Sequence, residues 1–360
     1  MAVHKLSDIV EKGLDLSDVE SCASYSFISD DDLVRAVTEL NERYVFKRED
    51  LANKSLDARL ASAYLYLYFT TNVPKLFKLL NYLPSELIKR IVQAPWIDFG
   101  SGPATYTVAW YAWLSSQGIL FPKEALLVEK DPSMMELANK VLDKFLHHEN
   151  ILVTSSFTQK KFIHATLFFG HSCNELTLEN LLQVIEEAQP QFVIFLEPGT
   201  PDVFKKMLEV RAHLLSRGYR VQFPCLQQKS CPMKQQDDWC HQYLHLRFPS
   251  SVERLSQMVS LRRQHSAVLF HVYERNPSQD SNVGEGHFRV VRGPEQNKGA
   301  WTWQVCNQEG ELLWFESLTR HYSKDQLKKL EMKVPGEVLV SVQIQKEVKP
   351  HHYRVLISQL

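Results

Sequence analysis

Three cysteines close together in the sequence have the clearest potential for chemistry. Cys225, Cys231 and Cys240 lie in a short polar stretch that also contains Pro224 and Pro232. A structural cysteine usually packs among apolar residues, but these have Gln, Lys, Asp and Ser as neighbours. Thiolates in such a segment are suitable ligands for a soft metal centre. The pattern therefore predicts a metal site, with reduced thiols that bind nothing as the alternative.

A closed site needs a fourth ligand. Cys306, in the β-like segment AWTWQVCN, is the first candidate and His241 is the second. Four thiolates suit either structural zinc or an iron–sulfur cluster, and the spacing does not separate the two. The absence of a C-x2-C pair argues against an ordinary zinc ribbon. Cys22 and Cys173 have no other cysteine close to them in the sequence, and we expect them to play no part in the metal site.

A glycine-containing loop is the second chemical feature. A predicted strand ends at Asp98 and leads through Gly100, Ser101 and Gly102 directly into a predicted helix. Glycine permits the tight turn and the close approach of a ligand, and the helix start offers free N–H groups. The next predicted strand ends at Glu129, a carboxylate suited to ribose hydroxyls. We predict that these five residues bind a cofactor.

The loop leaves three interpretations open. The order of strand, glycine loop, helix and acidic strand end is shared by dinucleotide and S-adenosylmethionine sites. Asp98 before the first glycine resembles the D-x-G-x-G-x-G/A pattern of methyltransferases and can meet the methionine amine, which favours S-adenosylmethionine. A turn without ligand is the third interpretation. The segment after the third strand offers Ser155 and Ser156 and no acid for the adenine, so we expect weak binding or backbone contacts there.

The elements around these residues predict an α/β fold with a doubly wound, Rossmann-like parallel sheet. Residues 30–87 have helical spacing, and the aromatic stripe ASAYLYLYF is expected to pack in a core. Pro74 should interrupt a helix or begin a new one. From Ala94 onward short apolar strands alternate with helices, and SAVLFHVYER is expected to be a late strand of the same sheet. A polar, glycine-bearing segment, NPSQDSNVGEG, then precedes five β-like segments.

Three parts are predicted from this pattern. They are an N-terminal helical region (1–93), a Rossmann-like domain (94–275) that includes the cysteine segment 224–241, and a small β-rich C-terminal module (276–360).

Composition narrows the class of protein. The 360 residues have a formal net charge of −1, which argues against a purely electrostatic, sequence-blind nucleic-acid binder. Local basic patches that could face nucleic acid remain possible, and the candidate residues are Arg254, Arg262, Arg263, Arg289, Arg292 and Lys298. No apolar run is long enough to span a bilayer, and the first residues lack the pattern of a signal or transit peptide. We expect a soluble, cytoplasmic monomer.

Three segments together resemble a known family. FGSGPAT, FLEPGTPDVFKKMLEVRAHL and the FPC…CP…DWCH stretch are similar to the Rsm22-type proteins of the small ribosomal subunit, over roughly residues 61–306. The resemblance implies a class I S-adenosylmethionine-dependent methyltransferase fold with a β-rich C-terminal extension. It also implies binding to the small ribosomal subunit and its rRNA during maturation, and, in mitochondrial matrix members, a 4Fe-4S cluster.

Carried over by position, the resemblance implies specific ligands. The cluster ligands would be Cys225, Cys231, Cys240 and Cys306, and this favours iron–sulfur over zinc. The cofactor residues would be Asp98, Gly100, Gly102 and Glu129.

Catalysis is left open. After the fourth strand the chain reads GHSCNEL, without the N/D-P-P-Y/F element that commonly holds a flipped base. Methyl transfer needs little beyond proximity, because the sulfonium cofactor supplies the electrophile. The hypotheses are an rRNA methyltransferase, a non-catalytic factor of subunit assembly, and a zinc-stabilised methyltransferase of a small molecule or another RNA. We favour binding and assign no catalytic residue.

Overall fold

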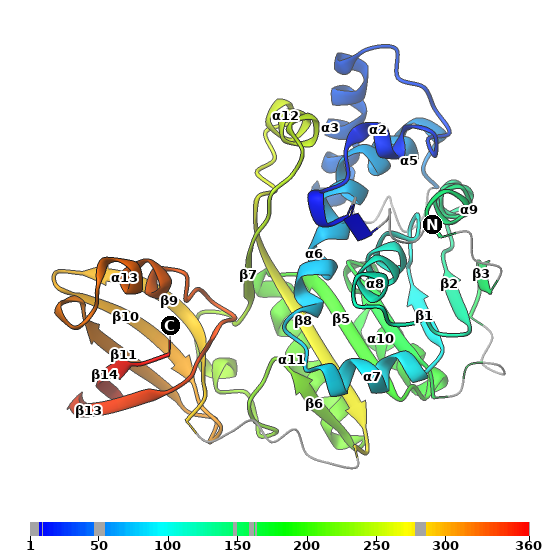
Figure 1. Cartoon of the computed structure of the whole chain (residues 1–360). Coiled ribbons are helices and arrows are strands. Elements are labelled where there is room, and N and C mark those ends of the chain that lie inside the picture. Colours follow the sequence, from blue (N-terminus) through cyan, green and yellow to red (C-terminus); the bar gives the residue numbers. More distant parts are fainter. Residues whose placement is uncertain are drawn as a thin grey trace. The chain divides into compact units, whose positions relative to one another are not determined.

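The chain divides into two compact units. The computed structural model describes residues 7–8, 10–46, 55–146, 150–157, 162, 164–277 and 286–359. One unit comprises residues 1–196 and 244–266, and the other comprises residues 197–243 and 267–360 (Figure 1). The three-part division expected from the sequence stays a prediction, and most of its linker, residues 278–285, lies outside the described residues.

Helices dominate the start of the first unit, as the apolar spacing predicts. The α-helices of this unit are α2 (Leu16–Glu20), α3 (Asp30–Phe46), α5 (Ala58–Tyr64), α6 (Thr70–Leu80), α7 (Ser85–Gln93), α8 (Thr105–Ser116), α9 (Pro132–Phe145), α10 (Leu178–Ala188) and α12 (Ser250–Met258). A π-helical segment, η1 (Leu65–Phe69), joins α5 to α6. Helix α3 packs on α5, and both α2 and α12 pack on η1. The aromatic stripe is largely buried within this group, because Leu65, Leu67 and Phe69 are fully inaccessible to solvent.

Pro74 does not break the helix, contrary to expectation. It lies inside α6, four residues after Thr70 begins that helix. Proline removes one backbone donor, so the carbonyl one turn earlier has no helical partner at that point. The π-helical segment immediately upstream widens the helix at this place, and such segments are frequent at functional sites.

The predicted Rossmann-like sheet is confirmed. Its parallel strands are β1 (Trp96–Phe99), β2 (Ala125–Val128), β3 (Ile151–Thr154), β4 (Thr166–Gly170) and β5 (Phe192–Pro198). The full order is β3-β2-β1-β4-β5-β8-β6, with β7 (Gln242–His245) pairing with β8. Strands β6 (Tyr219–Phe223) and β8 (His265–Arg275) are antiparallel, which confirms SAVLFHVYER as a late strand of this sheet. The order reverses direction between β1 and β4, and ligands bind at such a switch point.

Aromatic packing fixes the centre of the sheet. All residues of β4 are buried, as expected for a strand that is covered on both faces. Trp96 on β1 stacks on Trp110 of α8 with ring centroids 5.2 Å apart, and on Phe168 of β4 at 5.1 Å. These contacts hold the end of β1 and the start of α8 in a rigid arrangement.

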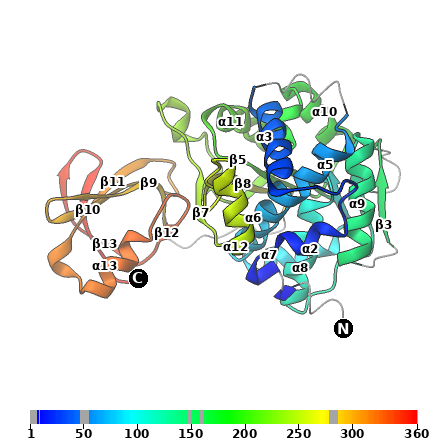
Figure 2. The same cartoon turned by 90° about the horizontal axis from the view of Figure 1, so that it is seen from above.

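The second unit contains the predicted β-rich segments. Its C-terminal sheet consists of β9 (Phe288–Asn297), β10 (Ala300–Cys306), β11 (Leu312–Leu318), β12 (Val338–Leu339), β13 (Val342–Lys349) and β14 (His352–Ile357). The strand order is β12-β9-β10-β11-β14-β13. Two helices also belong to this unit, α11 (Pro201–Ser216) and α13 (Lys324–Glu331). Figure 2 shows α13 beside the sheet; the sequence analysis did not predict this helix.

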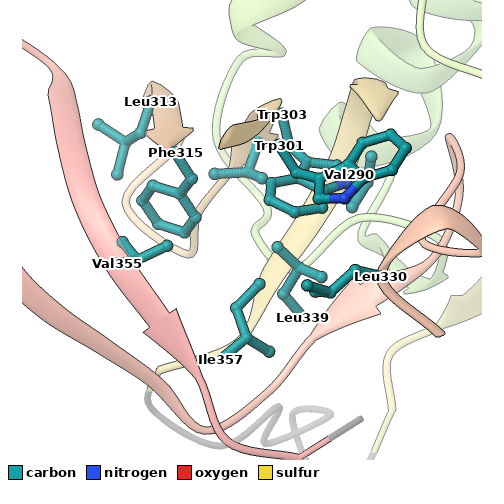
Figure 3. Close-up of a cluster of buried hydrophobic side chains, with 10 residues drawn as sticks. Val290, Trp301, Trp303, Leu313, Phe315, Leu330, Leu339, Val355 and Ile357 are labelled. Atoms are coloured by element: carbon teal, nitrogen blue, oxygen red, sulfur yellow. The ribbon is translucent and has the colours of Figure 1, made fainter. Parts of the chain in front are cut away.

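A separate hydrophobic core supports this sheet (Figure 3). Trp303 and Phe315 are fully buried, and Leu330 of α13 packs with them against Val290 and Ile357. Helix α13 starts with a capping box at Ser323, and Leu330 is its one buried residue. In the described part of the chain, every helix is too short or too polar to cross a membrane.

Candidate functional site

The glycine loop makes a sharp turn between β1 and α8. Gly100 and Gly102 have φ angles of +71° and +54°, in the left-handed region that favours glycine. A Cβ on Gly100 would lie 2.6 Å from Cβ of Ser172, so packing alone requires glycine there. A Cβ on Gly102 would meet only the Tyr64 hydroxyl, at 4.0 Å. The loop is thus packed tightly at its first glycine and has room at its second.

Glu129 braces this loop. Its Oε2 accepts a hydrogen bond from the backbone N–H of Gly102 at 2.8 Å, and its Oε1 accepts one from Asp131 N–H at 2.8 Å. Burial raises the pKa of Glu129, and these two hydrogen bonds offset part of that rise because they favour the ionised carboxylate. A carboxylate oxygen accepts more than one hydrogen bond, so Glu129 retains the capacity to accept ribose hydroxyls.

Asp98 lies beneath the loop, fully buried. Its Oδ2 accepts a hydrogen bond from Thr107 Oγ1 at 2.7 Å, while within the described chain Oδ1 has no hydrogen-bond partner. Burial raises the pKa of Asp98 to about 7. Ser101 is also buried, and its N–H donates to the carbonyl of Val128 at 3.2 Å. Asp98, Gly100, Ser101, Gly102 and Glu129 therefore come together at the carboxyl ends of β1 and β2.

Tyrosines from the helical region also reach this loop. Burial raises the pKa of Tyr64 to about 12, while hydrogen bonds with Thr105 and Asn72 lower it. The ring of Tyr64 stacks on that of Tyr68, with centroids 5.3 Å apart. The apolar spacing of this stripe predicted core packing only. The helical spacing that buries most of it also directs Tyr64 to the glycine loop.

Three basic side chains lie in the same unit: Lys75 and His171 were missed, whereas Arg263 was expected in a basic patch on the surface. Lys75 on α6 is only 4 % exposed, and burial lowers its pKa to about 7, with a further lowering by Arg263. His171 directly follows β4, and burial, Lys75 and Arg263 together hold its pKa well below the usual value. The guanidinium of Arg263 lies over the ring of Tyr68, 4.5 Å from its centroid. The only hint of this site in the sequence was Lys75, a lysine within an otherwise apolar helical pattern.

The four predicted cysteine ligands belong to the second unit. Cys225 follows β6, Cys231 precedes a short 3-10 helix (Pro232–Gln235), Cys240 precedes β7, and Cys306 ends β10. All four are free thiols of intermediate exposure. The loop between the first two packs near the turn after Cys306, because Lys229 donates a hydrogen bond to the Glu309 carbonyl at 3.3 Å.

The thiols are close enough to influence one another's ionisation. Burial raises the pKa of Cys231 to about 12, and the nearby Cys225 and Cys240 raise it further. Burial also raises the pKa of Cys306, with contributions from the other three thiols. Among the described residues, no group of three or more His, Cys, Asp or Glu side chains is arranged to hold a metal ion.

Two buried arginines accompany the cysteines. Arg289 is 2 % exposed; it donates to the Gly336 carbonyl at 3.2 Å and lowers the pKa of Cys240, which burial raises. Arg211 is 4 % exposed and donates to the Gln227 carbonyl at 3.1 Å. Within the described chain, Nε of each arginine is buried without a hydrogen-bond partner. The site therefore combines acceptor-type sulfur atoms with positive charge that is incompletely paired.

The other candidate ligands have different surroundings. His241 lies next to Cys240, its Nδ1 is 3.2 Å from the Trp239 carbonyl oxygen, and burial lowers its pKa. Cys22 and Cys173 are buried in the first unit, at 1 % and 0 % exposure.

The predicted basic patch needs correction. Arg289 is buried and does not belong to a surface patch. Arg263 is half-buried against Tyr68, whereas Arg262 is exposed. Arg254 pairs with Asp30 and Arg292 pairs with Asp238, and Lys298 is exposed. The patch was wrong in part because charge in a sequence does not reveal which side chains a fold buries.

Three of the solved structures with a similar fold are methyltransferases. TrmK of M. capricolum with bound S-adenosyl-homocysteine is 10 % identical, with a TM-score of 0.33 over 59 % of this chain and 71 % of that one. Magnesium protoporphyrin IX methyltransferase from Synechocystis with bound S-adenosylmethionine is 9 % identical, with a TM-score of 0.34 over 70 % and 100 %. Precorrin-6y C5,15-methyltransferase from Geobacter metallireducens is 15 % identical, with a TM-score of 0.32 over 51 % and 80 %. Similarity at this level carries no argument about ligand or substrate.

A family model gives the stronger result. No curated protein matches the chain. The family described as mitochondrial small ribosomal subunit Rsm22 matches residues 61–323, which include both the glycine loop and all four cysteines. The strand order above confirms the expected Rossmann-like α/β fold, and this match confirms the expected family. The chain belongs to the Rsm22 family of the mitochondrial small ribosomal subunit.

Proposed function

We propose that this protein binds S-adenosylmethionine at the glycine loop and a 4Fe-4S cluster at its four cysteines, and acts on the small ribosomal subunit and its rRNA during assembly. The convergence of Asp98, Gly102 and Glu129 at the switch point of the sheet is the observation that carries this proposal. Family membership supplies the ribosomal partner. A mitochondrial matrix location follows from the family and belongs to the proposal, whereas a cytoplasmic location stays a prediction.

The residues present fit S-adenosylmethionine. Glu129 would accept hydrogen bonds from the ribose hydroxyls, and Gly102 leaves room for the ligand next to the loop. Asp98 has an oxygen without a partner in the described chain, suited to the cofactor's amine. An approaching ammonium would favour the ionised form of this carboxyl, whose pKa is raised by burial. When bound, the cofactor supplies an electrophilic methyl group.

The cysteine site fits an anionic centre. Four cysteine thiolates are the usual ligands of a 4Fe-4S cluster, and such a centre carries net negative charge. Arg211 and Arg289 provide two buried positive charges close to these thiols. In the absence of a metal, burial raises the pKa values of Cys231, Cys240 and Cys306, so metal binding would release protons. These features support the 4Fe-4S cluster. Zinc is the alternative metal that the same four thiols could bind.

Metal analysis tests the cysteine site. The protein would be purified without oxygen and analysed for iron, sulfide and zinc, with an absorption spectrum recorded in parallel. We expect about four iron atoms per chain with matching sulfide, as a 4Fe-4S cluster requires. One zinc per chain without sulfide would replace the cluster by a zinc site and favour the zinc-stabilised methyltransferase.

A comparison of cells tests the function. Cells with the wild-type protein would be compared with cells in which Gly100 and Gly102 are both replaced by leucine, by mapping rRNA modification and small-subunit content. A defect in small-subunit content with an unchanged modification map is the expected result for an assembly factor. Loss of one rRNA methyl group would instead identify an rRNA methyltransferase, and unchanged subunits with an unchanged map would contradict the ribosomal role.

A further inference from the structure

Lys75 is a buried cation without an acidic partner. It is 4 % exposed, and among the described residues the charge that acts on its ammonium is that of Arg263 and not that of a carboxylate. The charges that act on it come from Arg263, which is itself positive. Burial of an unpaired charge is strongly unfavourable and lowers the pKa of this lysine to about 7, and an anion bound beside it would favour the charged form.

Two further donors lie close to Lys75. His171 is near both Lys75 and Arg263, because both cations lower its pKa. Nε2 of His171 and Nε of Arg263 are buried, and each lacks a hydrogen-bond partner among the described residues. The ring of His171 packs on Tyr106 at a centroid distance of 5.8 Å, which fixes its position after β4. Lys75, Arg263 and His171 are called the cationic cluster below.

The cationic cluster lies on the β4 side of the glycine loop. Glu129 follows β2 and His171 follows β4, and these strands flank β1 on opposite sides. Ser172, next to His171, is close enough to Gly100 to exclude a side chain there. Asn72, one turn before Lys75 on α6, interacts with Tyr64, whose hydroxyl faces Gly102. A ligand with its ribose at Glu129 would therefore extend its other end along the loop toward the cluster.

We propose that Lys75, together with Arg263 and His171, binds the α-carboxylate of S-adenosylmethionine. The inference rests on the proposed cofactor function and deepens it by naming residues for the amino-acid end of the ligand. Lys75 supplies the charge, and the two nitrogen atoms without partners supply hydrogen bonds. A backbone phosphate of RNA is disfavoured, because reaching a 4 % exposed ammonium would require a whole nucleotide to enter the fold.

Calorimetric binding to two ligands tests the inference. S-adenosylmethionine and its decarboxylated form differ only by the carboxylate, so the ratio of their affinities measures recognition of that group. For the wild-type protein we expect a preference of roughly ten- to hundredfold for the intact cofactor, the size of a charge-assisted interaction. In Lys75→Met this ratio should fall to about threefold or less, while affinity for the decarboxylated ligand is retained.

Two variants serve as comparisons. Lys89→Met replaces an exposed lysine on α7 and should leave the ratio unchanged. Arg263→Gln should reduce the ratio less than Lys75→Met, and it reports on the cluster even if the buried Lys75→Met variant fails to fold.

Each outcome has a definite meaning. An unchanged ratio in both Lys75→Met and Arg263→Gln, with both ligands still bound, would overturn the inference and leave the cofactor function standing. Loss of affinity for a small-subunit RNA fragment, with that ratio unchanged, would assign the cluster to RNA phosphate instead. Absence of binding of either ligand to the wild-type protein would contradict the cofactor function itself, and the inference with it.

Discussion

The glycine-loop site and the cysteine site are built in different ways. In the first unit, Asp98, Gly100 and Gly102 come from one uninterrupted strand–loop–helix segment, and Glu129 comes from the adjacent strand. In the second unit, four cysteines come from the ends of β6 and β10 and from the connecting segment before β7. The first site depends on local backbone geometry, whereas the second depends on distant segments packing together. Single substitutions should therefore affect the two sites differently.

The largest effect is expected at the cysteine site. Cys306→Ser removes a thiolate and should abolish nearly all iron binding, because a cluster held by three thiolates loses a full ligand. Anaerobic iron and sulfide analysis measures this, and binding of S-adenosyl-homocysteine to the first unit should persist. Cys173→Ser is the matched control, since Cys173 is buried in the other unit. Equal iron content in the two variants would exclude Cys306 as a ligand.

A comparison of two glycines tests how strongly the glycine-loop site depends on local backbone geometry and packing. Gly100 and Gly118 have similar φ angles, +71° and +67°, so alanine costs each about 1–2 kcal/mol of backbone strain. Only at Gly100 would the new Cβ meet another side chain, Ser172, and such overpacking adds about 1–3 kcal/mol. Urea denaturation should show the larger loss for Gly100→Ala. Affinity for S-adenosyl-homocysteine should fall at least about tenfold in that variant alone.

Iron content is the second measurement on the glycine variants. Gly100→Ala should retain the cluster, because the cysteines lie in the other unit. Equal losses of stability in the two glycine variants would show that close packing against Ser172 is unimportant.

The pH dependence of stability is expected to show the raised pKa of the Asp98 carboxyl. Burial raises its pKa from 3.8 to about 7, so the folded state holds a proton that the unfolded chain has lost between those values. The free energy of unfolding should therefore fall as pH rises through this window, by at most about 1.4 kcal/mol per pH unit. Asp98→Asn should flatten the slope in urea denaturation between pH 5 and 7. The exposed Asp143→Asn should not, and an unchanged slope in Asp98→Asn would contradict this assignment.

The smallest effect concerns two adjacent arginines. Arg262 is exposed and Arg263 is packed on Tyr68. Arg262→Glu should weaken co-sedimentation with the small subunit by about two- to fivefold at low salt and less at high salt, as a phosphate contact would. Arg263→Glu should additionally lower stability in urea denaturation, because it places a carboxylate in a packed position. Unchanged co-sedimentation of Arg262→Glu would remove that residue from the RNA-facing surface.

Prediction succeeded where local patterns decide the outcome. The β1 turn, its two positive-φ glycines and the acid after β2 are all encoded within a few residues, so the loop was visible in the sequence. Pro74 and α13 were misjudged or missed. The π-helical turn before α6 accommodates a proline that isolated rules treat as a break. Helix α13 has only 8 residues and lies among β-like segments, so it offers few turns from which a helical spacing can be recognised.

The sequence alone determined the glycine loop, the alternation of strands and helices, and the family. Such features depend on φ preferences and apolar spacing that act over a few residues. Only the tertiary structure placed Lys75 beside His171 and Arg263, and buried Arg289 near the cysteines. Burial and pairing of charges arise from contacts between distant segments, and no local pattern specifies which cation is left without an acidic partner.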